Sequence, residues 1–322
     1  MQPRPEVSVA VPVYFNAESL VQLYDRIAAT MSKLGVTWDV TFVDDGSEDD
    51  SRTVLNLLNE QHDNVRVVHL VRNFGSTPAI LAGLSFASGR CACVISADLQ
   101  DPPEALEALV NLWRGGARIA VAARESRTDP LSSRLFSAIY YLLFRWLVTT
   151  RMPKGGFDIV AMDHQVAKLL VSNAENNTNF PAALLSLGFA CEAISYHRVK
   201  RPYGSSKWTF WRKYKLMYDS ILSFSYRPLR IISAMGLLGL LVAFLYGIEV
   251  VWNRLTSPND PPGWASLMVV TLFFNGLVLM SLGVIGEYVW RTFVAAQRIP
   301  AFVVERSIEP KLRGRREQAD VS

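Results

Sequence analysis

Short apolar runs alternate with segments of helical periodicity from the first residues to about residue 124. The apolar runs predict strands at Val7–Val13, Val40–Val43, Val65–Val71, Cys91–Ala97 and Ile119–Ala123. The segments between them predict helices at Glu18–Leu34, Asp49–Gln61, Pro78–Ala87 and Pro102–Trp113. Strands that alternate with helices are typical of an α/β fold, with a mostly parallel sheet covered on both faces.

Two long apolar segments near the C-terminal end predict transmembrane helices. Ile231–Ile248 and Trp264–Gly286 contain no charged residue. At ~1.5 Å per residue the second segment reaches roughly 34 Å, enough to cross a hydrocarbon core of ~30 Å. Soluble helices of this length normally have a polar face, so we expect both segments to span a membrane.

The basic residues around these segments predict the orientation of the protein. The connecting loop Asn253–Gly263 holds one basic residue, Arg254, whereas Arg227, Arg230, Arg291 and Arg298 lie outside the pair. Because basic residues stay on the cytoplasmic side, we expect both termini and the catalytic domain on the cytoplasmic face of the inner membrane. The first residues are polar, so we expect no signal peptide.

Two further segments resemble helices that lie in a membrane surface. Leu135–Phe144 is uncharged but too short to span, and Trp208–Tyr218 mixes aromatic with basic residues. An ordinary core-facing helix is the alternative for the second. The expected organisation is a catalytic domain with interfacial helices at 1–226, a two-helix anchor at 227–292 and a basic cytoplasmic tail at 293–322.

Composition agrees with a membrane protein and argues against several other classes. Half of the 322 residues are hydrophobic, and the net charge is only +4. Three cysteines provide neither a disulfide framework nor a C-x-x-C metal spacing. The chain lacks G-x-G-x-x-G and Walker motifs, which argues against dinucleotide and P-loop sites. We expect no nucleic-acid partner.

Acidic turns follow two of the predicted strands. They are Asp44-Asp45-Gly46-Ser47 and Asp98-Leu99-Gln100-Asp101. Ligands of parallel sheets bind at the carboxyl ends of the strands. Clustered carboxylates there suit a divalent cation bridged to substrate phosphates, although a single Asp-Gly turn is also a common plain turn.

The motifs resemble the polyprenyl-phosphate branch of glycosyltransferase family 2, which includes dolichol-phosphate mannose synthase and bactoprenol glucosyltransferases. The resemblance covers about residues 7 to 304. It rests on Val11–Glu18, Asp44–Ser47, Arg72–Gly75, Ala97–Glu104, Arg201–Trp208, Pro228–Arg230 and Gly286–Tyr288.

The resemblance implies a GT-A fold and a set of donor-binding residues. Pro12, Tyr14, Glu18, Asp44 and Asp45 are expected to bind the nucleotide, with Asp44 accepting a hydrogen bond from the base. Asp98 and Gln100 match the metal-binding positions of the family, and the metal is Mg²⁺ or Mn²⁺. A metal on the diphosphate stabilises the departing nucleotide, which makes Asp98 a catalytic residue as well.

The resemblance also assigns the acceptor side. Asp158 is the second expected catalytic residue, and because a phosphate acceptor is already anionic, we expect Asp158 to orient groups rather than abstract a proton. Candidates for binding the donor diphosphate or the lipid phosphate are Arg124, Arg127, Arg201, Ser206 and Lys207. A solvated charged face is the alternative for Arg124 and Arg127.

The sequence departs from the family pattern in three places, one of which is Ser76-Thr77-Pro78 after Phe74-Gly75. Ser96 replaces the first carboxylate of the usual D-x-D, and Asp101 compensates only if its turn lets it point inward. Val160 stands where the family has an arginine after Asp158, and Lys154 is a candidate to substitute for that cation.

The expected function is inverting transfer of a sugar from a UDP- or GDP-sugar donor to undecaprenyl or a similar polyprenyl phosphate. Relatives suggest a homo-oligomer, a tetramer. Two alternatives stay open at this point: a family-2 transferase that extends a glycan, and a non-catalytic membrane scaffold. Binding of a nucleotide and a divalent cation distinguishes the enzyme from the scaffold.

Overall fold

The computed structural model describes residues 4–124, 152–153, 156–173, 179–197, 225, 227–256, 263–297 and 299–310. The chain divides into two compact units. The first contains Met1–Ser220 together with Pro300–Ser322, and the second contains Ile221–Ile299. The segments 135–144 and 208–218, for which we predict membrane-surface helices, lie outside the described residues.

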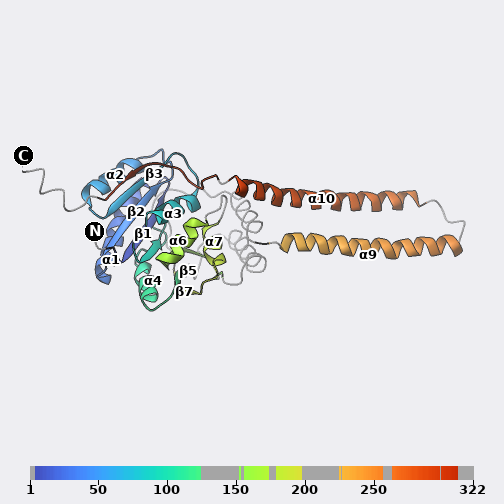
Figure 1. The fold of residues 1–322 in the computed structure, drawn as a ribbon, viewed down its shortest axis with the longest axis horizontal. Helices are drawn as coiled ribbons and strands as arrows, with labels where there is room; N and C mark the ends of the chain where they lie inside the picture. Colours follow the sequence, from blue (N-terminus) through green and yellow to red (C-terminus); the bar gives the residue numbers. More distant parts are fainter. Residues whose placement is uncertain are drawn as a thin grey trace, which may run out of the picture. The chain divides into compact units, whose positions relative to one another are not determined.

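The first unit is built on one eight-stranded sheet (Figure 1). The strand order is β7-β5-β6-β4-β1-β2-β3-β8, and every strand runs in one direction except β6 and β8. The strands are β1 (Val7–Val13), β2 (Trp38–Asp44), β3 (Val65–Leu70), β4 (Cys91–Val94), β5 (Ile119–Arg124), β6 (Phe157–Asp163), β7 (Cys191–Tyr196) and β8 (Val304–Ile308). The five predicted strands are therefore present in a mostly parallel sheet.

Helices cover both faces of this sheet (Figure 1). The larger core lies between the sheet and α1, α2 and α4, and the smaller one includes α3, which also contacts α6. The bounds are η1 (Ala17–Ser19), α1 (Leu20–Leu34), α2 (Ser51–Gln61), α3 (Ser76–Ser85), α4 (Ala105–Arg114), α6 (His164–Ser172) and α7 (Phe180–Ser186).

The alternation of side chains along β1 explains why two layers of helices are needed. Val9, Val11 and Val13 point into the larger core, whereas Ala10 faces α3. A Cβ added to Gly83 of α3 would lie 2.8 Å from the Ala10 Cβ. Small residues at this crossing let the helix pack close to the sheet, and both faces of the central strand are therefore buried.

The edge of the sheet is closed by a strand from the far end of the chain. β8 pairs antiparallel with β3, and Arg52 and Arg66 form ion pairs with Glu305 and Glu309. The sequence analysis placed residues 293–322 in a basic tail; residues 304–308 of that range form this edge strand. Pairing removes the exposed hydrogen-bonding edge of β3, which would otherwise be open to another chain.

The second unit is a pair of long helices, α9 (Arg227–Thr256) and α10 (Trp264–Ala296), which contact each other. Both contain stretches long and apolar enough to cross a membrane, at Leu229–Glu249 and Phe273–Ala296. Within the second stretch Glu287 and Arg291 form an i,i+4 ion pair with an N–O distance of 2.9 Å. This pairing lowers the cost of placing two charges at the end of an apolar helix.

The edge strand provides a test of the fold. Ile308 packs against the larger core, whereas Arg306 on the same strand is exposed. Ile308→Ala should destabilise the protein by about 1–2 kcal/mol, and lower the thermal unfolding midpoint by about 2–6 °C. Arg306→Ala should change the midpoint by less than about 1 °C, because exposed substitutions have small effects. Equal midpoints for the two variants, measured in detergent, would contradict the burial of β8.

Candidate functional site

The strand order reverses between β1 and β4. The chain runs from β1 to β2 and β3 on one side, and β4 then returns to the other side of β1. Ligands of open α/β sheets bind at the carboxyl ends of the strands at such a reversal. The loops that leave β1 and β4 each contain a non-glycine residue at positive φ, Phe15 at 56° and Leu99 at 55°. Such strained conformations concentrate at functional sites.

Asp44 at the end of β2 is completely buried, and both of its oxygens are engaged. Oδ1 accepts a hydrogen bond from the Ser47 backbone N–H at 2.9 Å, and Oδ2 lies 3.0 Å from Nδ1 of His69 and 3.6 Å from Nε of Arg52. Burial alone raises the pKa of Asp44, but the hydrogen bonds from His69 and Ser47 outweigh it and hold the pKa below its ordinary value. Asp44 therefore joins β2, β3 and α2.

Asp45 holds the loop that follows β3. Its two oxygens accept hydrogen bonds from the backbone N–H groups of Phe74 (2.7 Å) and Gly75 (2.9 Å). Gly46 packs against the same loop, since an added Cβ would lie 2.8 Å from the Arg72 carbonyl carbon and from the Asn73 nitrogen. The Asp-Asp-Gly turn is therefore a junction between two loops, and only glycine fits at its third position.

The loop after β1 is fixed by side chains of the β2 turn and of α2. The backbone N–H of Phe15 donates to Ser47 Oγ at 3.2 Å, and that of Asn16 donates to Ser51 Oγ at 3.0 Å. On the other side the Ser19 hydroxyl donates to the Ala97 carbonyl at 2.6 Å, which ties this loop to the one after β4. Four loops at the carboxyl edge thus share one hydrogen-bond network.

The residues that we predict to bind the nucleotide differ in their exposure to solvent. Tyr14 and Glu18 are exposed and Pro12 is half-buried, all in or beside the loop after β1. Asp44 and Asp45 lie at the same edge but are buried in the contacts described above. The sheet brings the five residues to one edge, and their contact with a nucleotide stays a prediction.

The loop after β4 carries the predicted metal residues. Asp98 and Gln100 are half-buried, and Asp98 Oδ1 accepts a hydrogen bond from the Gln100 backbone N–H at 3.2 Å. The Ser96 hydroxyl lies 3.3 Å from Asp98 Oδ1 and 2.9 Å from Asp101 Oδ2. Asp101 does point inward, as compensation for Ser96 requires, but it is completely buried and bonded to Ser96 and Tyr196.

The described residues contain no group of three or more His, Cys, Asp or Glu that could hold a metal ion. Magnesium sites for phosphates need only one or two carboxylates, because the substrate phosphates and water complete the coordination. Asp98, with the Gln100 amide beside it, fits a metal that is held mainly by a bound diphosphate.

Arg124 and Asp158 meet at the adjoining part of the edge. Arg124 ends β5, Asp158 is the second residue of the antiparallel β6, and their side chains form an ion pair. Val160 is fully buried between Val94 and Val121, its partners on the flanking strands. Among the described residues, Arg124 of the neighbouring strand is a cation that faces Asp158. Lys154, Arg127, Arg201, Ser206 and Lys207 lie outside the described residues.

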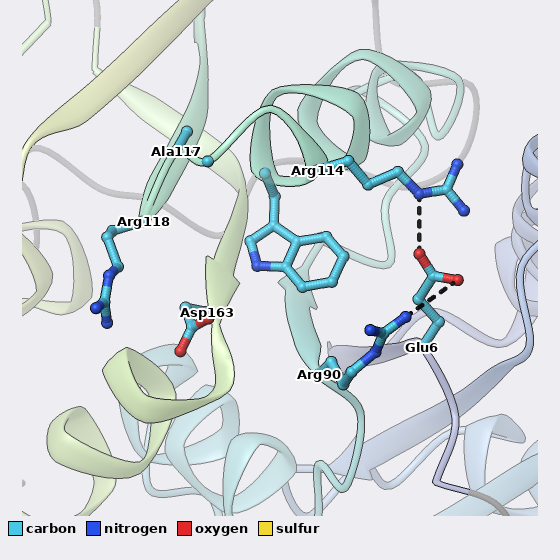
Figure 2. Close-up of a pocket in the computed structure, with 8 residues that line it drawn as sticks. Glu6, Arg90, Arg114, Ala117, Arg118 and Asp163 are labelled. Atoms are coloured by element: carbon cyan, nitrogen blue, oxygen red, sulfur yellow. Dashed lines mark hydrogen bonds and ion pairs between the residues drawn. The ribbon is translucent and has the colours of Figure 1, made fainter.

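A second concave surface lies at the opposite edge of the sheet (Figure 2). This cavity of about 320 Å³ is bordered by Glu6, Arg90, Arg114 and Arg118, near the amino ends of β1, β4 and β5. Glu6 lies 2.8 Å from Nε of Arg114 and 3.7 Å from Arg90, and the bond from Arg114 lowers its pKa. Its arginines are engaged within the protein, and it lies away from the carboxyl edge where ligands of such sheets bind.

Comparison with known proteins identifies the family. Residues 8–157 match the model of glycosyl transferase family 2. An uncharacterized glycosyltransferase of Synechocystis sp. is 32% identical over 93% of this chain and 94% of its own. The chain belongs to glycosyl transferase family 2. The bactoprenol glucosyl transferase of Shigella phage SfII is 30% identical over 94% of this chain and 98% of its own.

A solved structure is also similar. The match to a mannosyltransferase from Pyrobaculum calidifontis, in complex with GDP-Man and Mn²⁺, covers 90% of this chain and 88% of that chain, at 16% identity and a TM-score of 0.47. The family membership confirms that the chain is a glycosyltransferase, and the expected GT-A fold with a mostly parallel sheet is confirmed as well.

Several residues that hold the carboxylates at this edge were not predicted from the sequence. His69 and Arg52 hold Asp44, and Tyr196 holds Asp101. For His69 a signal was present, because a polar side chain inside an apolar strand usually has a buried partner. Tyr196 belongs to β7, a strand for which the sequence analysis made no prediction.

Gly46 allows a matched test of the loop junction. Gly46 (φ 70°) and Gly35 (φ 62°) both have left-handed backbones, but nothing lies within 4 Å of a Cβ added to Gly35. Alanine at either position destabilises the protein by about 1–2 kcal/mol, because its Cβ disfavours the left-handed backbone conformation. Only Gly46→Ala should also displace the 72–75 loop, and so weaken UDP or GDP binding in calorimetry. Equal binding by both variants would contradict the junction.

Asp45 should make stability depend on pH. Burial raises its pKa to about 6, above the ~3.9 of an unfolded aspartate. The folded protein therefore binds this proton more tightly, and the resulting stability is complete below about pH 4 and is lost as the pH rises through about 6. We compare the free energy of unfolding of the wild type with that of Asp45→Asn. The difference, wild type minus variant, should decrease by up to about 3 kcal/mol from pH 4 to 7. Chemical denaturation at several pH values measures this difference, and an increase would contradict the prediction.

Proposed function

We propose that this enzyme transfers a sugar from a UDP- or GDP-sugar to a polyprenyl phosphate such as undecaprenyl phosphate, with inversion, at the cytoplasmic face of the membrane. The observation that carries the proposal is full-length similarity. Relatives named bactoprenol glucosyl transferase match 93–94% of this chain, including its two long apolar helices. A transferase that is attached to the membrane and acts on a lipid phosphate needs both parts.

The donor would bind at the carboxyl ends of β1 and β4, where the strand order reverses. Tyr14 is 39% exposed and stands edge-on to Phe15, with ring centroids 4.6 Å apart. An exposed aromatic ring held by the strained Phe15 turn offers a surface for a nucleotide base. The diphosphate would then extend toward the Asp98 loop, which the Ser19–Ala97 hydrogen bond fixes beside the β1 loop.

Asp98 and Gln100 would hold a divalent cation on the donor diphosphate, where it stabilises the charge that develops on the leaving nucleotide. The half-buried position of Asp98 supports this role, since partial exclusion of water strengthens an interaction between charges. The Gln100 backbone N–H keeps the Asp98 carboxylate in one orientation.

The acceptor phosphate would approach the Arg124–Asp158 pair. An oxygen of the lipid phosphate attacks the anomeric carbon, the bond from that carbon to the nucleoside diphosphate breaks, and the products are a sugar–phosphate lipid and UDP or GDP. The phosphate is already ionised and needs no general base. We assign Arg124 to attract the phosphate and Asp158 to orient Arg124, because their ion pair restricts the guanidinium.

The full chain in detergent or lipid nanodiscs tests the proposal. It should convert radiolabelled nucleotide-sugar and undecaprenyl phosphate, with Mg²⁺ or Mn²⁺, into a product that extracts into organic solvent. Asp98→Asn should lower kcat at least about 100-fold, as expected for loss of electrostatic stabilisation of the leaving group. Asp25→Asn, at an exposed position on α1, is the control and should leave kcat unchanged.

The alternatives predict other results. Transfer to an oligosaccharide but to no lipid phosphate would indicate glycan extension. Absence of nucleotide binding in calorimetry would indicate a scaffold. Either result would refute the proposed reaction.

A further inference from the structure

A buried tyrosine connects the two halves of the site. Tyr196, at the end of β7, is 8% exposed, and its hydroxyl donates a hydrogen bond to Oδ1 of Asp101. Asp101 is completely buried, and its second oxygen lies 2.9 Å from the Ser96 hydroxyl, whose single proton is shared between Asp101 and Asp98 Oδ1 at 3.3 Å. Two hydroxyl groups therefore hold this carboxylate in the loop that also contains Asp98.

The same tyrosine contacts the acceptor side. Arg124 and Tyr196 are direct partners in the parallel pairing of β5 with β7, so their side chains lie next to each other on the same face of the sheet. Arg124 also forms the ion pair with Asp158. Polar contacts thus run from Asp98 through Ser96 and Asp101 to Tyr196, and Arg124, which pairs with Asp158, lies beside Tyr196 on the neighbouring strand.

The ionisation states of the two groups fix the direction of the hydrogen bond between Tyr196 and Asp101. Asp101, as a carboxylate, is an acceptor, so the tyrosine must supply the proton. Burial and the nearby charge of Asp101 raise the pKa of Tyr196, so its hydroxyl keeps the proton at all physiological pH values. Buried hydrogen bonds of this kind hold their members in one geometry, because breaking any bond leaves a buried polar group without its partner.

We propose that Tyr196 is a positioning residue: through Asp101 and Ser96 it sets the orientation of Asp98, and through Arg124 it sets the orientation of the Arg124–Asp158 pair. The donor diphosphate and the acceptor phosphate would thereby meet in a fixed relation. The inference rests on the proposed function, since it concerns the alignment of those two substrates. It also gives Ser96 a role as a hydrogen-bond donor in place of the absent carboxylate.

Tyr196→Phe removes only the hydroxyl and keeps the ring. Loss of a partner that orients a ligating or catalytic group typically costs 10–100-fold in affinity or activity. We expect kcat for transfer to decrease about 10–100-fold, and Mn²⁺-dependent binding of UDP or GDP to weaken about 10-fold, on the same scale. The binding is measured by calorimetry and does not require turnover.

Tyr24→Phe is the matched control. Tyr24 on α1 is 6% exposed, and its hydroxyl donates to Asn64 Oδ1 at 3.0 Å, so this substitution also removes one buried tyrosine hydrogen bond. Both variants should lose a similar amount of thermal stability, but only Tyr196→Phe should alter binding and kcat. If the two variants are equal in both kcat and binding, the positioning role is wrong.

Ser96→Ala tests the same series of polar contacts from the side of Asp98. Because Ser96 and Tyr196 act on the same carboxylate, the double variant should lose less than the product of the two single losses in kcat or binding. If the loss in the double variant equals the product of the two single losses, the proposed connection between Ser96 and Tyr196 is wrong. A wild-type protein that binds nucleotide with Mn²⁺ but makes no lipid-linked sugar would refute the proposed function, and the binding comparison would still decide the role of Tyr196.

Discussion

A carboxylate removed from water must be hydrogen-bonded or paired with a cation, and this requirement organises the carboxyl edge of the sheet. Asp44, Asp45 and Asp101 are all buried there. Each takes its partners from a different segment, so each joins loops that are distant in the sequence. The partners are backbone N–H groups, hydroxyl groups, one histidine and one arginine. The geometry of the site follows from satisfying these three charges.

The buried carboxylates leave a second set of residues to meet substrates. Tyr14 and Glu18 are exposed, and Asp98 is half-buried, in loops that the buried network holds. The strained backbones of Phe15 and Leu99 persist because hydrogen bonds on both sides fix their loops. Such division of labour is typical of preorganised sites, in which the groups that touch substrate are oriented by groups that do not.

The two apolar helices lie, in chain order, between two strands of the same sheet. They separate β7 from β8, so both ends of the helical pair continue into strands of the same sheet. The ion pair of Arg52 with both Asp44 and Glu305 also links β8 to the β2 turn.

The sequence by itself determined the local features: five strands, the helices between them, two apolar spans, and acidic turns at strand ends. These depend on periodicity over a few residues, which the chain displays directly. Only the tertiary structure decided which carboxylates are buried, that His69 stands beside Asp44, and that Arg124 pairs with Asp158. It also decided the pairing of β8 with β3. These contacts join neighbouring strands, and strand order places side by side residues that no spacing along the chain relates.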